Sequence, residues 1–328
     1  MTSLAPTLQA FFTDRLAQRQ ASPHTISAYR DTLRLLIVFA SEQTHTQPWQ
    51  LDIAELDAPL VSAFLDHLQQ TRGNSARTRN ARLAAIHSLF RFAALRHPEH
   101  AAVIQRVLAI PPKRADRPLI SYLTEPEIAA LLAAPDRTTW TGRRDHALLA
   151  LAVQTGLRAS ELTGLNTSEL HLPRPGYVSC RGKGRKERIT PLTKTTAATL
   201  RVWLTERQGD PTDPLFPTRH GARLSRDALE HRLAKYTAIA SAKAPTLADK
   251  TVTAHVLRHS AAMRLLHAGV DLTVIALWLG HESTDTTQIY LHADLAIKER
   301  ALARTTPPGT PPGRYRPPDT TLAFLESL

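Results

Sequence analysis

The sequence predicts a mainly α-helical protein with one small β-sheet, divided into two domains. Apolar residues recur every three or four positions along most of the 328 residues, which is the spacing of helices that bury one face. The helical period breaks between residues 177 and 192, where two short extended runs flank a Gly-rich turn. A chain of this length is longer than a domain built around a single hydrophobic core usually is, so two domains are expected.

The N-terminal domain, residues 1–110, is predicted to be a small helical domain. Apolar residues from Leu8 to Leu16 have helical spacing, and Ser22 followed by Pro23 is a favoured N-cap and first-turn pair. A second helix should therefore begin at Pro23. Further helices are expected near residues 58–70 and 78–96.

Residues 111–120 are predicted to form an extended linker, because Pro111, Pro112 and Pro118 enclose a charged segment without a helical or strand period. The second domain, residues 121–303, opens with a helix, since Thr124 and Glu127 form a capping-box pattern. The break at residues 177–192 predicts a β-hairpin with Lys183 at its tip. The remaining helices are expected near residues 143–154, 159–165, 194–207, 225–241, 253–267, 271–279 and 285–292.

Composition restricts the partners and the compartment. The formal net charge is +12, from 41 Lys plus Arg against 29 Asp plus Glu, and such an excess suits a polyanionic partner or solubility. The single cysteine, Cys180, excludes an intramolecular disulfide and fits a reducing cytoplasm. The longest strongly apolar run, residues 147–153, is far shorter than the ~20 residues of a membrane span, so no membrane association is expected.

Six side chains in four short motifs carry the chemistry that we expect. Two arginines, a lysine, two histidines and a tyrosine follow one another in T-G-L-R-A-S-E-L, R-G-K-G-R-K-E-R, H-V-L-R-H and L-G-H-E-S-T-D-T-T-Q-I-Y: Arg158, Lys183, His255, Arg258, His281 and Tyr290. Taken singly, each has an ordinary interpretation; Arg158, for example, could merely pair with Glu161. The ordered set suits attack on a phosphodiester, where cations neutralise the phosphate and a proton donor assists the leaving oxygen.

That ordered set resembles the active site of the tyrosine recombinase (phage integrase) family, with members of the Xer-like kind. The resemblance covers about residues 120–295, and the stretch R-N-A-R-L-A-A-I-H-S-L-F-R-F-A is similar to a helix of the family's core-binding domain. It implies a helical core-binding (SAM-like) domain followed by an α+β catalytic domain. The residues after Ala303 form a Pro-rich tail, residues 304–328, whose last apolar residues either dock on a neighbouring protomer, as in the family, or fray.

The chemistry and the resemblance together assign a role to each residue. Arg158 and Arg258 would grip the scissile phosphate through forked donors, and His281 would donate a further hydrogen bond. Tyr290 would be the nucleophile and His255 its base. Lys183 would be the general acid, although Lys186 remains an alternative. Glu161 resembles a family position that supports the site from beneath.

Four arginines around the start of the predicted helix at 78–96 are candidates for DNA contact: Arg72, Arg77, Arg79 and Arg82. Guanidinium groups and free backbone N–H groups could both meet phosphates there, whereas the alternative is a solvated basic face. No cofactor and no metal are expected. His255 and His259 are four residues apart, but H-V-L-R-H lacks the glutamate of a metalloprotease helix, and Tyr315 lies too far from His281 to replace Tyr290.

The resemblance implies site-specific recombination through a covalent 3′-phosphotyrosine intermediate, for integration or excision of a mobile element or for Xer-like resolution. The expected partner is a double-stranded DNA recombination site, and the active form is expected to be a homo-oligomer on DNA, a tetramer, alone or with related recombinases. Two alternatives remain at this point. One is a catalytically inactive DNA-binding accessory protein, and the other is relaxation of the type IB topoisomerase kind.

Overall fold

A computed structural model of the chain describes residues 4–114, 120–182, 187–280, 287 and 290. The chain divides into two compact units, Met1–Arg117 and Pro118–Leu328. Both units are mainly helical, and the described part of the second also contains a three-stranded antiparallel sheet. The predicted fold class is therefore confirmed.

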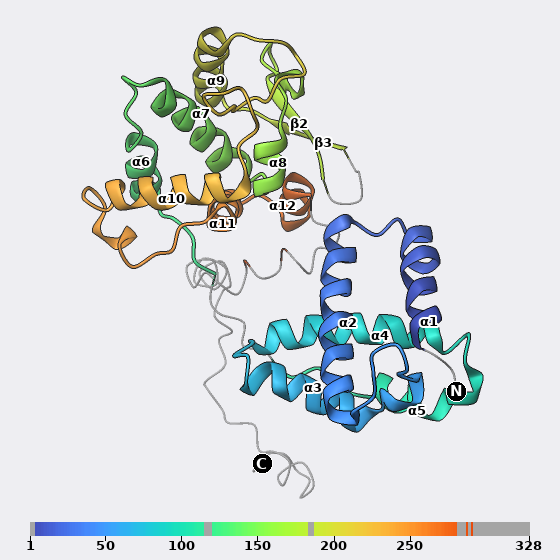
Figure 1. Ribbon diagram of the computed structural model, residues 1–328. Coiled ribbons are helices and arrows are strands. Elements are labelled where there is room, and N and C mark those ends of the chain that lie inside the picture. The colour runs from blue at the N-terminus through green and yellow to red at the C-terminus, as the bar shows by residue number, and fades with distance from the viewer. Residues whose placement is uncertain (1–3, 115–119, 183–186, 281–286, 288–289, 291–328) are drawn as a thin grey trace, which may run out of the picture. The chain divides into compact units, whose positions relative to one another are not determined.

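The first unit is a set of helices around one apolar core. Ser22 caps the long helix α2, because its hydroxyl accepts the N–H of Thr25 and Pro23 occupies the first turn, as predicted. Figure 1 shows α2 running across α3 and α4, and α4 also packs on α5. The helices are α1 (Leu4–Ala10), the π-helix η1 (Phe11–Leu16), α2 (Pro23–Thr44), α3 (Ala58–Gln70), α4 (Ala76–Ala93) and α5 (Ala101–Leu108).

Helix α5 was not predicted from the sequence, and the core of this unit explains why it forms. Ile104 and Val107 of α5 are fully buried, in the same apolar cluster as Phe64 and Phe90. An eight-residue helix is marginal by itself, so burial of these two side chains against α3 and α4 supplies its stability.

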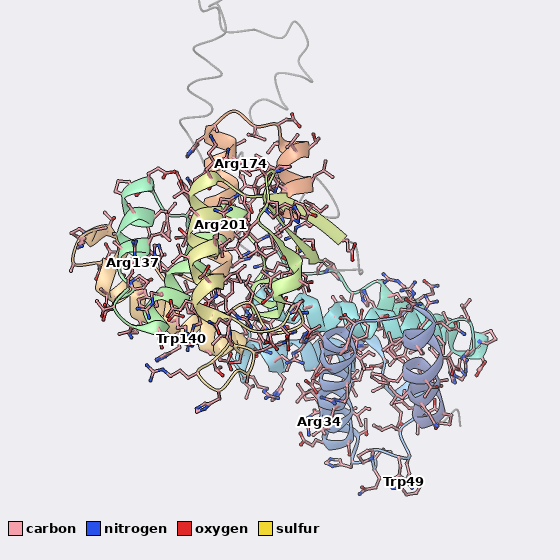
Figure 2. The ribbon with its side chains drawn as sticks, turned by 90° about the horizontal axis from the view of Figure 1, so that it is seen from above. Arg34, Trp49, Arg137, Trp140, Arg174 and Arg201 are labelled. Atoms are coloured by element: carbon pink, nitrogen blue, oxygen red, sulfur yellow. The ribbon has the colours of Figure 1, made fainter. Side chains whose placement is uncertain are left out.

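The second unit surrounds the central helix α7, which packs against α6, α9 and α11. Leu148 and Leu151 of α7 are buried, and Trp203 of α9 lies with its ring 5.3 Å from that of Trp140, which is labelled in Figure 2. The elements are α6 (Glu125–Ala133), α7 (Trp140–Thr155), α8 (Ala159–Gly164), β1 (Leu170–His171), β2 (Tyr177–Arg181), β3 (Glu187–Pro191), α9 (Lys194–Arg207), α10 (Arg226–Ala240), α11 (Ala254–His267) and α12 (Leu272–Leu279).

Local sequence signals set the ends of the helices. The N–H of Thr124 donates to Glu127 over 2.7 Å at the start of α6, which confirms the predicted capping box. Gly156 follows α7 and Gly280 follows α12, each with φ near +65°, a conformation that glycine adopts without a Cβ penalty. These two glycines turn the chain toward the site described below.

The sheet consists of the predicted hairpin, β2 and β3, with the two-residue strand β1 added at its edge. Cys180 on β2 faces Arg188 on β3 in the antiparallel register. The Cys180 thiol is buried, and burial raises its pKa to about 11, so it is protonated and unreactive at neutral pH. Helix α12 packs against both α11 and β3.

The remaining predicted helix, residues 285–292, lies outside the described residues except for Thr287 and Tyr290, which are both helical and buried. In the described part of the chain, no helix combines the length and the apolar character that crossing a membrane requires.

Candidate active site

Two arginines meet at the C-terminal end of α12. Arg258, on α11, donates from Nη1 to the Gly156 carbonyl at 2.8 Å and from Nη2 to the Leu279 carbonyl at 2.6 Å. Arg158, at the N-cap of α8, donates from Nη2 to the next carbonyl, that of Gly280, at 2.9 Å. The last carbonyls of a helix lack intrahelical partners and carry partial negative charge, so they attract both guanidinium groups to one place.

The environments of these two arginines differ. The Arg158 side chain is 32% exposed, whereas Arg258 is only 3% exposed. Burial, and then the nearby charge of Arg158, lower the pKa of Arg258 to about 10. Arg258 therefore remains a cation at neutral pH but lacks a full hydration shell, which strengthens its attraction for an anion.

Glu161 lies between Arg158 and a third arginine, Arg188 of β3. Its carboxylate accepts the backbone N–H and Nη1 of Arg158 at 2.7 and 2.8 Å, and both Nη1 and Nη2 of Arg188 at 2.9 and 2.7 Å. Burial raises the pKa of Glu161, but these hydrogen bonds, those from Arg188 foremost, outweigh it and bring the pKa to about 2. We call Arg158, Arg188 and Arg258 around Glu161 the arginine cluster.

Tyr290 is buried, with 1% of its surface exposed, and its hydroxyl lies 3.0 Å from Nδ1 of His259. Burial raises the pKa of Tyr290 to about 12, against an opposing effect of the Arg258 charge. The ring of exposed His255 stacks edge-on against His259, with 4.2 Å between ring centroids. The order from the surface inward is therefore His255, His259 and Tyr290.

The structure thus brings together four of the six predicted catalytic residues: Arg158, Arg258, His255 and Tyr290. Arg158 does pair with Glu161, as the ordinary interpretation had it, while its other Nη group is directed to the end of α12. Lys183, its alternative Lys186, and His281 lie outside the described residues, as does Tyr315.

Sequence reasoning missed the positions of Arg188 and His259. Arg188 was one of several basic residues in R-G-K-G-R-K-E-R, and only the strand register places it opposite buried Cys180, facing the interior. His259 was considered with His255 as a possible metal ligand, but it is the residue that contacts the phenol. Its position one residue after Arg258 on α11 gave no signal of this, because Tyr290 is distant in sequence.

The candidate DNA-binding arginines lie on the first unit, at the end of α3 and on α4. Arg72 and Arg77 are exposed, and Arg82 donates to the Thr32 hydroxyl at 3.3 Å. Arg79 is 4% exposed, and among the described residues its Nε and Nη1 have no hydrogen-bond partner. Buried donors without acceptors are unfavourable, so these two nitrogens of Arg79 cost stability in the structure described.

Within the described residues, no three His, Cys, Asp or Glu side chains gather in a way that could hold a metal ion. The four acceptor positions of the Glu161 carboxylate are already taken by the N–H donors of two arginines. What the site can do with its own side chains is bind an anion at the arginine cluster beside a tyrosine.

Comparison with known proteins agrees with this chemistry. Residues 121–296 match the phage integrase family, and residues 8–97 match the phage integrase N-terminal SAM-like domain. A protein of Sinorhizobium fredii named as an integrase/recombinase, y4rC, is 58% identical over 99% of this chain and 98% of its own length. The tyrosine recombinase XerD of Pseudomonas putida is 31% identical over 93% of this chain and 98% of its own length.

Solved structures show the same fold. The Tn1549 transposon integrase in complex with a circular intermediate DNA has a TM-score of 0.67 and 17% identity, covering 90% of this chain and 98% of that one. The XerH site-specific recombinase bound to palindromic difH substrate has a TM-score of 0.66 and 24% identity, covering 87% and 81%. The match to the phage integrase family covers more than half of this chain, and the Sinorhizobium fredii relative is similar along the whole chain. This chain therefore belongs to the phage integrase family of tyrosine recombinases.

Proposed function

We propose that the chain cuts and rejoins DNA at a specific site through a covalent 3′-phosphotyrosine at Tyr290. The observation that carries this proposal is the placement of Arg158 and Arg258 at consecutive carbonyls of one helix end, with the charge of Arg258 acting on the Tyr290 phenol. Two guanidinium groups next to a phenol are suited to stabilising a five-coordinate phosphate during attack by that phenol, which a site that only binds DNA would not need.

The proposed cleavage step is an in-line displacement. The Tyr290 oxygen forms a bond to phosphorus while the bond from phosphorus to the 5′-oxygen breaks, and the phenol proton passes to a base, for which we propose His255. Lys183 gives its proton to the departing 5′-oxygen. His281 and the two arginines hold the nonbridging oxygens. Reversal of these steps by another 5′-hydroxyl rejoins the strand without an external energy source.

The resting position of Tyr290 adds a requirement to this scheme. Its hydroxyl bonds to buried His259 rather than to exposed His255, and a phenol with a pKa of about 12 is a poor nucleophile at neutral pH. We propose that DNA binding moves the phenol from His259 toward the phosphate, where the arginine cations favour its ionisation.

The first unit is proposed to hold the duplex. Arg72 and Arg77 are exposed to meet phosphates, whereas Nε and Nη1 of Arg79 are buried and would reach DNA only after a local rearrangement. We further propose that the active assembly is a tetramer on DNA, acting in the cytoplasm. Relatives named as integrases and as Xer recombinases support movement of a mobile element or Xer-like resolution as the biological task.

A suicide substrate tests the proposal. The natural site is first isolated by selecting bound duplexes from a random DNA library, and a nick is then placed beside the scissile phosphate so that religation is blocked. Wild-type protein should form an adduct that survives denaturing electrophoresis, with or without a chelator, and Tyr290→Phe should bind this DNA without forming it. Binding by the wild type with no adduct on any selected site would instead support an accessory DNA-binding protein.

A further inference from the structure

Arg188 contacts the arginine cluster from a different element than either predicted arginine. It lies on β3 with a side chain 11% exposed, and its two terminal nitrogens reach both oxygens of Glu161 at 2.9 and 2.7 Å. This is the bidentate geometry in which a guanidinium binds a carboxylate most strongly. The Glu161 side chain is 4% exposed, so water screens the contact little.

Arg188, the third arginine, changes the net charge around Glu161. Glu161 alone with Arg158 would form a neutral pair, and the negative charge of Glu161 would then offset much of the field that Arg158 offers to a phosphate. With Arg188 on the other side of the carboxylate, the cluster has two more cations than anions. The effect of Arg188 extends further, because its charge is one of those that lower the pKa of Arg258.

Gly280 fixes the position of Arg188 on its other side. A Cβ added to Gly280 would lie 2.7 Å from Nη1 and 3.1 Å from Cδ of Arg188, so the arginine packs directly on the glycine backbone. The carbonyl of the same glycine accepts Nη2 of Arg158. Arg188 therefore contacts both groups, Glu161 and Gly280, that hold Arg158 in place.

We propose that Arg188 is a positioning residue for the recombination chemistry: it neutralises and orients Glu161, so that the charge of Arg158 is available to the scissile phosphate. The inference rests on the proposed function, since it concerns the same phosphate. It assigns Arg188 no direct contact with DNA, and it predicts that the effect of Arg188 depends on the charge of the phosphate.

The experiment compares two DNA substrates under single-turnover conditions, using the full chain in excess over the nicked suicide duplex. One substrate carries the ordinary anionic phosphodiester at the scissile position, and the other carries a neutral methylphosphonate, tested as each stereoisomer. Arg188→Met removes the charge while keeping much of the apolar stem. Arg188→Lys keeps the charge and loses the fork.

Arg188→Met is expected to slow adduct formation on the phosphodiester by about 10- to 100-fold, less than the roughly 100- to 1,000-fold cost of losing a direct transition-state donor, because Arg188 acts through Arg158. On the methylphosphonate, whose transition state carries one negative charge fewer, the deficit should shrink to about threefold or less. Arg188→Lys should fall between wild type and Arg188→Met on the phosphodiester. DNA affinity in the absence of cleavage should stay within about threefold of wild type for both variants.

Arg143→Met is the matched control, because Arg143 makes a similar bidentate pair with Glu206, at 2.7 and 2.7 Å, on α7 and α9. It should cleave both substrates like wild type. Equal slowing of Arg188→Met on both substrates, or wild-type rates on the phosphodiester, would overturn the inference. If Arg188→Met fails to fold, Arg188→Lys takes its place, and the slowing on the phosphodiester is again compared with the slowing on the methylphosphonate. A wild type that forms no adduct with either substrate defeats the proposed function itself.

Discussion

Tyr290 is the residue whose surroundings say most about the reaction. Its phenol is buried against His259 and its pKa is raised to about 12, so the structure holds the proposed nucleophile in its neutral, unreactive form. The sequence made Tyr290 a candidate nucleophile but did not reveal this environment, because no local pattern links Tyr290 to a histidine on α11.

The raised pKa predicts an alkaline change in stability. Folding favours the neutral phenol, so its contribution is complete below the ordinary pKa of about 10 and is lost as the pH rises from there through about 12. Between pH 9 and pH 12 the wild type should therefore lose about 2 kcal/mol more unfolding free energy than Tyr290→Phe. Urea unfolding across this range measures it, and parallel curves for the two proteins would show that the phenol is not held as described.

Glu161 predicts the opposite dependence at low pH. Its folded pKa, about 2, is below the ordinary value of 4.5, so its contribution is present above pH 4.5 and is lost as the pH falls through 2. At pH 7, Glu161→Gln should lower the unfolding free energy by about 3 kcal/mol, because partly exposed Arg158 and largely buried Arg188 lose their anion. Urea unfolding should show the gap closing toward pH 2, and a gap independent of pH would contradict the assignment.

At the scale of elements, the end of α12 organises the site. Its last carbonyls and Gly280 gather Arg158, Arg258 and Arg188 from α8, α11 and β3. The periodicity of apolar residues was enough to predict these helices and the hairpin, because each buries one face. It could not predict which guanidinium meets which carbonyl, since those contacts join residues more than 20 positions apart whose partners are backbone atoms.

Gly280→Ala tests this organisation, with Gly269→Ala as its control. Both glycines have positive φ, +65° and +82°, but a Cβ at Gly269 meets nothing within 4 Å whereas one at Gly280 meets Arg188. Both variants should lose about 1 kcal/mol to backbone strain. Only Gly280→Ala should also slow adduct formation, by about 10-fold or more, as measured on the suicide substrate. Equal activity of the two variants would contradict a role for the Arg188–Gly280 contact.

At the scale of the whole molecule, the excess of positive charge is expected to act through particular arginines. The composition indicated that the expected partner is negatively charged, and the helical pattern placed four arginines near the start of α4. Only the structure separates exposed Arg72 and Arg77 from Arg79, which is buried with unpaired donors. Burial of a charged side chain is a tertiary property, so no count of basic residues reveals it.

The salt dependence of DNA binding distinguishes a phosphate contact from a solvated surface charge. Arg77→Ala should reduce the slope of log K against log salt concentration by about 0.9, as expected when one phosphate contact is lost. Arg96→Ala is the control, because exposed Arg96 already pairs with Asp14 at 3.2 Å. Fluorescence anisotropy with a labelled duplex measures both slopes. An unchanged slope for Arg77→Ala would place this arginine outside the interface.

The most direct measurement is the identity of the amino acid joined to DNA. Wild-type protein trapped on the nicked suicide duplex is digested with nuclease and protease, and the modified peptide is sequenced by mass spectrometry. We expect a nucleotide joined through its 3′-phosphate to the Tyr290 oxygen and to no other residue. A link at a different side chain, or a Tyr290→Phe protein that still becomes attached to DNA, would contradict it.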